Sequence, residues 1–142
     1  MNVPAAGPTD KAMGIAFDAL KANEAAFLDT MFKATGFFLL ALGWLLTSEK
    51  SRDLLGGNAV AKYAALLAIL LIAATHVWVL IERYRRSLAI LALLASDSAT
   101  GPYYRLYAVT TKHLISGLLV NLALAAVLFI VICTLPVPAG PR

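Results

Sequence analysis

Long apolar stretches separated by short polar segments run through the chain, and their lengths predict helices. The clearest is residues 59–81, in which Lys62 and His76 are the only side chains that can carry a charge near neutral pH. At about 1.5 Å per residue, this stretch is long enough to cross a hydrocarbon core of about 30 Å. It ends at the charged segment 82–86, which contains three arginines. We therefore predict a membrane-spanning helix with a basic collar at one end.

The N-terminal third of the chain combines an amphipathic segment with a second apolar run. Between residues 11 and 31, apolar side chains recur every three or four positions, which is typical of an amphipathic helix. The apolar run 34–46 follows directly but is only about 20 Å long as a helix, so we expect the span to begin near Phe27. This places Asp29 and Lys33 close to the bilayer edge, four positions apart and in the favourable order for a helical ion pair.

Two further segments extend the helices beyond the membrane. Residues 87–95 are uncharged, contain no glycine or proline, and are too short to span a bilayer alone. We expect them to pack against the amphipathic part of the first helix. The third helix is expected to open at Pro102 with three tyrosines, a residue type enriched at membrane interfaces, and to continue through the apolar run 114–135.

These patterns predict an all-α integral membrane protein with three long antiparallel transmembrane helices and cytoplasmic helical extensions. We expect a single three-span membrane domain over residues 1–142, because short connections force neighbouring helices to be antiparallel. The expected helices are residues 10–48, 59–95 and 102–135. Residues 1–8 and 136–142 are rich in proline and glycine and are expected to be disordered.

Small and polar residues predict the connections between the helices. Residues 54–58 are expected to form a turn, with Asn58 capping the second helix. Residues 96–101 are expected to form a loop, with Thr100 as a candidate cap for the third helix. The first 33 residues carry seven charges of both signs, so we expect no cleavable signal peptide.

Composition and charge support a membrane location and indicate an orientation. The 142 residues are 61% hydrophobic and 14% charged, whereas soluble domains carry about 25% charged residues. Eight of the twelve Lys and Arg residues lie before residue 34 or within residues 82–113. The positive-inside rule therefore predicts a cell inner-membrane protein with a cytoplasmic N-terminus and a periplasmic C-terminus. We interpret Arg83, Arg85 and Arg86 as lipid headgroup contacts and expect no nucleic-acid binding.

Three polar side chains in the spans fall at one expected depth. Lys33, His76 and Asn121 each lie about 9–10 Å below the cytoplasmic surface, and Asp29 lies one turn above Lys33. One interpretation is an ion or proton path, or a ligand site, with His76 as the titrating group. The other is an interhelical polar layer in which His76 and Asn121 hydrogen-bond across helices and Lys33 reaches the headgroups. We favour the structural interpretation.

The two histidines also raise a haem hypothesis, with His76 as the candidate cofactor-binding residue. His113 is expected near the membrane surface and His76 several ångströms deeper, so one haem would not suit both within one chain. The alternative is that two His76 side chains, one from each chain of a dimer, bind one haem between them. The single cysteine, Cys133, excludes an intramolecular disulfide and a cysteine-based zinc site. We expect no cofactor and no metal.

The function classes follow from what the spans offer. Motifs for nucleophilic, metal-dependent or phosphate chemistry are absent from the sequence, so we expect neither catalytic residues nor an enzyme. The leading hypothesis is a non-enzymatic accessory or scaffold subunit of a larger membrane assembly. Its partners would be membrane lipids and either other membrane subunits or further copies of the chain. Small residues at 61, 64, 65 and 68 would permit close helix packing.

Two other classes remain open. One is a homo-oligomeric pore or small ion or proton transporter, of which a phage holin is a specific version, although the predicted outward C-terminus argues against a holin. The other is a haem-bearing electron carrier.

Overall fold

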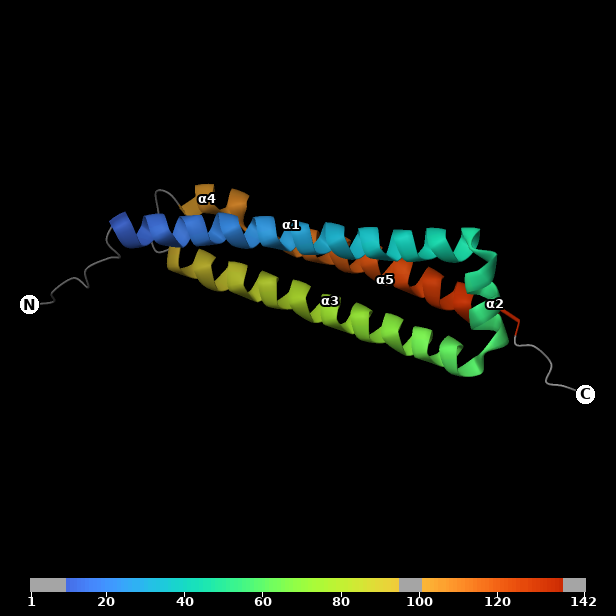
Figure 1. Cartoon of the computed structure of the whole chain (residues 1–142). Coiled ribbons are helices and arrows are strands. Elements are labelled where there is room, and N and C mark those ends of the chain that lie inside the picture. The colour runs from blue at the N-terminus through green and yellow to red at the C-terminus, as the bar shows by residue number, and fades with distance from the viewer. Residues whose placement is uncertain (1–9, 95–100, 137–142) are drawn as a thin grey trace, which may run out of the picture.

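Three long helices pack side by side in the computed structural model, which describes residues 10–94 and 101–136 (Figure 1). They are α1 (Asp10–Thr47), α3 (Ala59–Leu94) and α5 (Thr111–Thr134). Three short helical segments accompany them: α2 (Glu49–Gly57), α4 (Gly101–Tyr104) and the 3₁₀ turn η1 (Arg105–Tyr107). Figure 1 shows α3 running antiparallel to both α1 and α5, with α2 at one end of the bundle and α4 beside the other end.

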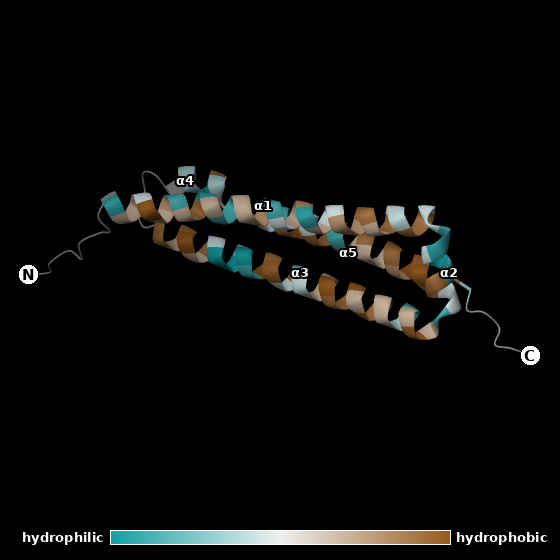
Figure 2. Ribbon diagram, viewed as in Figure 1, coloured by the Kyte–Doolittle hydropathy of each residue, from teal (hydrophilic) through white to brown (hydrophobic). Residues whose placement is uncertain are grey.

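All three long helices are long and apolar enough to cross a membrane. The candidate spans lie within Lys11–Thr47, Ala59–Leu94 and Arg105–Thr134. Figure 2 shows apolar residues along most of their surface, with hydrophilic residues on α2, in a band of α3 and at intervals along the N-terminal half of α1. The predicted all-α fold class with three long antiparallel helices is confirmed, and the chain is a small multi-span membrane protein.

The connection between the first two spans differs from the expected turn. Residues 49–57 form α2, which is capped by Ser48, whose hydroxyl oxygen accepts a hydrogen bond from the Ser51 backbone N–H. A serine at this position satisfies a free N–H group of the first helical turn, and an acidic residue such as Glu49 is favourable there. Asn58 caps α3 as predicted, because its Oδ1 accepts a hydrogen bond from the Ala61 N–H at 3.1 Å.

The predicted continuous helix over residues 102–135 is wrong at residues 108–110. The chain leaves helical geometry at Ala108 and re-enters it after Thr110, which has an extended backbone. Thr110 and His113 form a reciprocal capping box that starts α5. Ala95, the predicted loop residues 96–100 with the cap Thr100, and the terminal segments 1–8 and 137–142 lie outside the described residues. Gly101, which was expected in the loop, is the first residue of α4.

The buried apolar side chains form three clusters along the bundle. The cluster near α2 contains Phe38, Leu45, Leu66, Ile69, Ala125, Leu128 and Ile132. The middle cluster contains Phe27, Leu80 and Val109, and the third contains Leu20, Leu94 and Ala108. The third cluster joins the start of α1 to the end of α3, so the expected packing of the α3 extension on the first helix is confirmed for its described residues.

Candidate functional site

Asp29 and Lys33 lie on the outer surface of α1. Lys33 Nζ is 2.7 Å from Asp29 Oδ2, so the ion pair expected from their spacing forms. Both side chains are exposed rather than directed into the bundle. An exposed pair of this kind contributes at most about 1 kcal/mol in water. The structure therefore places these two charges apart from the interhelical space.

His76 lies half-buried in α3 and bonds within its own helix. Its Nδ1 is 2.9 Å from the Ile72 carbonyl oxygen, which requires Nδ1 to be the donor. In the neutral ring, Nε2 is then an acceptor. The imidazole also packs beside Phe38 of α1, with the ring centroids 6.4 Å apart.

Asn121 is the buried polar residue of α5 at the same level of the bundle. Its side chain is 4% exposed, and its Nδ2 donates to the Gly117 carbonyl oxygen at 2.9 Å. Its Oδ1 is buried and has no partner among the described residues. A buried acceptor without a donor costs about 1–3 kcal/mol. Asn121 therefore retains an unused acceptor inside the bundle.

Contacts one turn away establish this common level. A Cβ at Gly117 would lie 3.6 Å from Leu80 and 3.3 Å from Met31, so α5 lies close to both other spans there. Residues four positions apart share a helix face. Because α3 and α5 are antiparallel, Asn121 and His76 stand one turn further along from the Gly117–Leu80 contact. Asn121 and His76 therefore lie at the same level along the bundle, whereas the Lys33 side chain is on the outer surface of α1.

Lys62 is a buried cation whose role was not predicted. Its ammonium donates to the backbone carbonyl oxygens of Cys133 at 2.9 Å and Leu135 at 2.8 Å. The last carbonyls of a helix lack intrahelical donors and carry partial negative charge. Lys62 therefore closes the end of α5. Its spacing of four and seven residues from the buried Leu66 and Ile69 is the sequence signal that could have shown that it faces inward.

Two other buried polar contacts connect the opposite half of the bundle, and neither was predicted. Asn23 Nδ2 donates to the Arg83 carbonyl oxygen at 2.9 Å and joins α1 to α3. The fully buried Ser87 hydroxyl accepts a hydrogen bond from the Val109 N–H at 2.9 Å. The second contact gives the Val109 N–H an acceptor, which it needs because the chain leaves helical geometry before α5.

The basic collar lies on one stretch of α3. Arg86 Nε is 3.0 Å from Glu82 Oε1, and Arg85 is exposed. Arg83, Arg86 and Trp78 are among the residues that line a surface hollow of about 200 Å³. The arginine side chains are therefore available on the outer surface of the bundle.

Four aromatic rings hold α4 and η1 against the start of α1. The Phe17 ring lies 5.1–6.0 Å from the rings of Tyr103, Tyr104 and Tyr107. Lys21 Nζ lies 4.1 Å from the Phe17 ring centroid, within cation–π range. The hydrogen bond between the Tyr103 and Tyr107 hydroxyls raises the pKa of Tyr103 above its usual value.

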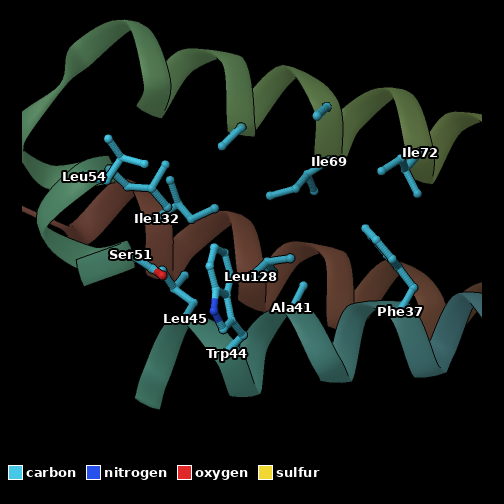
Figure 3. A pocket seen from close by; sticks show the side chains of 13 residues that line it. Phe37, Ala41, Trp44, Leu45, Ser51, Leu54, Ile69, Ile72, Leu128 and Ile132 are labelled. Atoms are coloured by element: carbon cyan, nitrogen blue, oxygen red, sulfur yellow. The ribbon is translucent and has the colours of Figure 1, made fainter. Parts of the chain in front are cut away.

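Two apolar cavities open on the sides of α3. The first, between α1 and α3 and beside α2, has a volume of about 230 Å³ (Figure 3). Its lining includes Trp44, Ala68 and Leu128. The second lies between α3 and α5 and has a volume of about 320 Å³, with Ala73 and Ala126 in its lining. We call these the α1/α3 cavity and the α3/α5 groove.

The two histidines have different surroundings. His113 is exposed and takes part in the capping box of α5. It lies eight residues from Asn121, or about 12 Å along the helix axis, and so about 12 Å from the level of His76. Within the described segments, no three His, Cys, Asp or Glu side chains gather closely enough to hold a metal ion.

Comparisons with protein-family models, with curated proteins and with solved structures find no match to this chain.

Proposed function

We propose that this multi-span membrane protein is a non-enzymatic accessory or scaffold subunit of a larger membrane assembly. It would reside in the cell inner membrane, with the N-terminus and the α4 end of the bundle in the cytoplasm and the α2 end in the periplasm. The basic collar on α3 supports this orientation, because Arg83, Arg85 and Arg86 would then meet the anionic headgroups of the cytoplasmic leaflet.

The observation that carries the proposal is the α3/α5 groove. Three alanines, Ala73, Ala125 and Ala126, line it beside larger apolar side chains such as Leu70 and Ile130. Small side chains let the backbones of neighbouring membrane helices approach closely, and the resulting van der Waals packing favours helix association in lipid. The groove therefore has the surface chemistry of a seat for a transmembrane helix of a partner subunit.

The hydrogen bonds of the buried polar side chains support a structural role for the protein. Lys62 bonds to the end of α5, Asn23 to α3, and Ser87 to the segment before α5. These contacts fix the helices relative to one another instead of lining a path. A rigid bundle with an apolar outer groove suits a scaffold subunit.

A proton or ion path is the second candidate, and Asn121 is the observation that favours it. Its unpaired Oδ1 lies at the level of the half-buried, titratable His76 ring, whereas the other unpaired buried amide oxygen of the described residues, that of Asn23, lies nearer the α4 end of the bundle. Under this alternative, His76→Ala should change proton flux in proteoliposomes. The scaffold proposal expects no flux in either protein.

The groove can be tested by co-purification from the native membrane. Ala126→Trp would fill the groove, whereas Ala123→Trp adds the same bulk at an exposed α5 position that does not line it. We expect a foreign subunit to co-purify with the wild type and with Ala123→Trp but not with Ala126→Trp. Retention of that subunit by Ala126→Trp, or purification without any foreign subunit, would contradict the proposal.

A further inference from the structure

We propose that the α1/α3 cavity binds one acyl chain of a zwitterionic membrane phospholipid, whose headgroup lies over α2. This site is separate from the α3/α5 groove assigned above to a partner helix. Figure 3 shows the cavity lined by side chains of α1 and α3 at its sides, of α5 behind, and of α2 at one end.

The lining has the chemistry of a hydrocarbon site. Ser51 is the only residue with a hydroxyl group among the thirteen that line the cavity. That hydroxyl donates to Ser48 Oγ at 2.7 Å and is therefore already paired. A polar ligand would find few partners, whereas an acyl chain needs only apolar contact.

The dimensions fit one chain. The lining residues extend from Phe37 to Leu45 on α1 and from Ala65 to Ile72 on α3. These ranges correspond to about 10–12 Å along the helix axes. A volume of about 230 Å³ along that length can hold part of one unbranched acyl chain.

The position of α2 favours a flexible chain over a transmembrane helix. α2 packs against both α1 and α3, and Leu54 and Leu55 contribute to the cavity wall. A straight helix lying along the cavity would run into α2. A phospholipid can bend at this point, so that its acyl chain lies in the cavity while its headgroup lies on the outer side of α2.

The charges of α2 complement a headgroup that carries both signs. Glu49 and Asp53 balance Lys50 and Arg52 within this short helix. Arg52 also donates to the Leu46 carbonyl oxygen, which fixes its guanidinium beside the end of α1. A zwitterionic headgroup offers a phosphate to the basic side chains and an amine to the acidic ones. The arginine collar at the other end of α3 lacks this balance and suits anionic lipid.

Tryptophan quenching can test the site. Trp44 lines the cavity and is 63% exposed, whereas Trp78 lies beside the basic collar. In a Trp78→Phe protein, Trp44 alone reports on the cavity. The protein would be placed in phosphatidylglycerol nanodiscs containing a small, increasing fraction of phosphatidylethanolamine brominated near the headgroup end of one acyl chain.

The matched variants are Ala68→Phe, which fills the cavity, and Ala64→Phe, which adds the same ring at an exposed position of α3 outside it. We expect quenching of Trp44 to saturate at a several-fold lower lipid fraction in the parent and in Ala64→Phe than in Ala68→Phe. Ala41→Leu, which fills the cavity from the α1 side, should behave like Ala68→Phe. Equal curves in all four proteins would mean ordinary surrounding lipid and would overturn the proposal.

Native mass spectrometry supplies a second readout. We expect one bound phospholipid on the parent and on Ala64→Phe, and loss of this adduct in Ala68→Phe. A polypeptide that is bound to the parent and lost in Ala68→Phe would assign the cavity to a protein partner and overturn the lipid site. Because the partner-helix proposal concerns Ala126, its failure would leave both lipid readouts unchanged.

Discussion

The ammonium of Lys62 and the backbone carbonyl oxygen of Cys133 lie 2.9 Å apart and join α3 to the end of α5. A second bond, to the Leu135 carbonyl oxygen, completes the contact. Lys62 is only 8% exposed, and its partners are backbone carbonyls. The charge is therefore accommodated by the negative end of a helix, and it sets how α3 and α5 meet beside α2.

Lys62→Met should weaken this end of the bundle. Methionine keeps an unbranched apolar stem but leaves the Cys133 and Leu135 carbonyls without their donor. We expect the free energy of unfolding to fall by about 1–3 kcal/mol, measured by denaturant titration in detergent micelles. Lys50→Met, at an exposed position of α2, should change stability by no more than about 0.5 kcal/mol. Equal stability of the two variants would show that the Lys62 contacts contribute nothing.

Gly56 should tolerate no side chain. A Cβ at this position would lie 2.7 Å from the Pro136 carbonyl oxygen, so the contact between α2 and the end of α5 would have to open. We expect Gly56→Ala to lower the midpoint of thermal unfolding, with a loss of about 1–3 kcal/mol.

Gly43→Ala is the matched control, because nothing lies within 4 Å of a Cβ there. Alanine should be neutral or better than glycine at that helical position, by up to about 1 kcal/mol. If Gly56→Ala and Gly43→Ala had the same unfolding midpoint, the close approach at Gly56 would not contribute to stability.

Ser87→Ala should release the segment before α5. The Val109 N–H would lose its buried acceptor, at a cost of about 1–3 kcal/mol. Hydrogen exchange should show faster exchange of the Val109 amide, while Ser116→Ala, at an exposed α5 position, should leave it protected. Unchanged protection at Val109 in Ser87→Ala would contradict this account of the break.

Asn121→Leu separates the structural and the proton-path interpretations. Leucine has a similar size and removes an acceptor that has no donor in the described structure. If Asn121 serves packing alone, stability in micelles should be unchanged or higher. A loss of more than about 1 kcal/mol would mean that Oδ1 binds a partner such as water. Proton flux measurements on the same variant would then decide whether that partner conducts.

The tyrosine pair gives a pH prediction for the α4 end of the bundle. The pKa of Tyr103 is raised chiefly by its hydrogen bond to Tyr107 and by repulsion between the two phenolates. Because the folded pKa lies above the unfolded one, this contribution to stability is present below the usual tyrosine pKa and is lost as the pH rises above it. In Tyr107→Phe, ultraviolet titration should show Tyr103 ionising at lower pH. An unchanged titration would contradict this cause.

Features that depend on nearby residues could be predicted from the sequence. The three spans follow from runs of apolar residues, the Asp29–Lys33 pair from a spacing of four, and the Asn58 cap from its place before an apolar run. The helical geometry of residues 49–57 was missed because two glycines and an asparagine are also typical of turns. Gly56, one of the two, serves a close approach to Pro136 instead.

Features that depend on distant residues could not be predicted. Lys62 bonds to carbonyls 71 and 73 positions away, and Asn23 bonds to one 60 positions away. The break at residues 108–110 is stabilised by Ser87, 22 positions from Val109. The common level of His76 and Asn121 agrees with the predicted depths, but the outward direction of Lys33 depends on how α1 rotates against its neighbours. Hydropathy contains no information about that rotation.

Native mass spectrometry of the wild-type protein, extracted gently from its own membrane, tests the scaffold proposal most directly. We predict that the protein is released together with at least one foreign membrane subunit and without a cofactor mass. A ladder of identical copies alone would contradict the proposal and favour a pore. Extra mass matching a haem or another cofactor would contradict the expectation that the chain binds no cofactor.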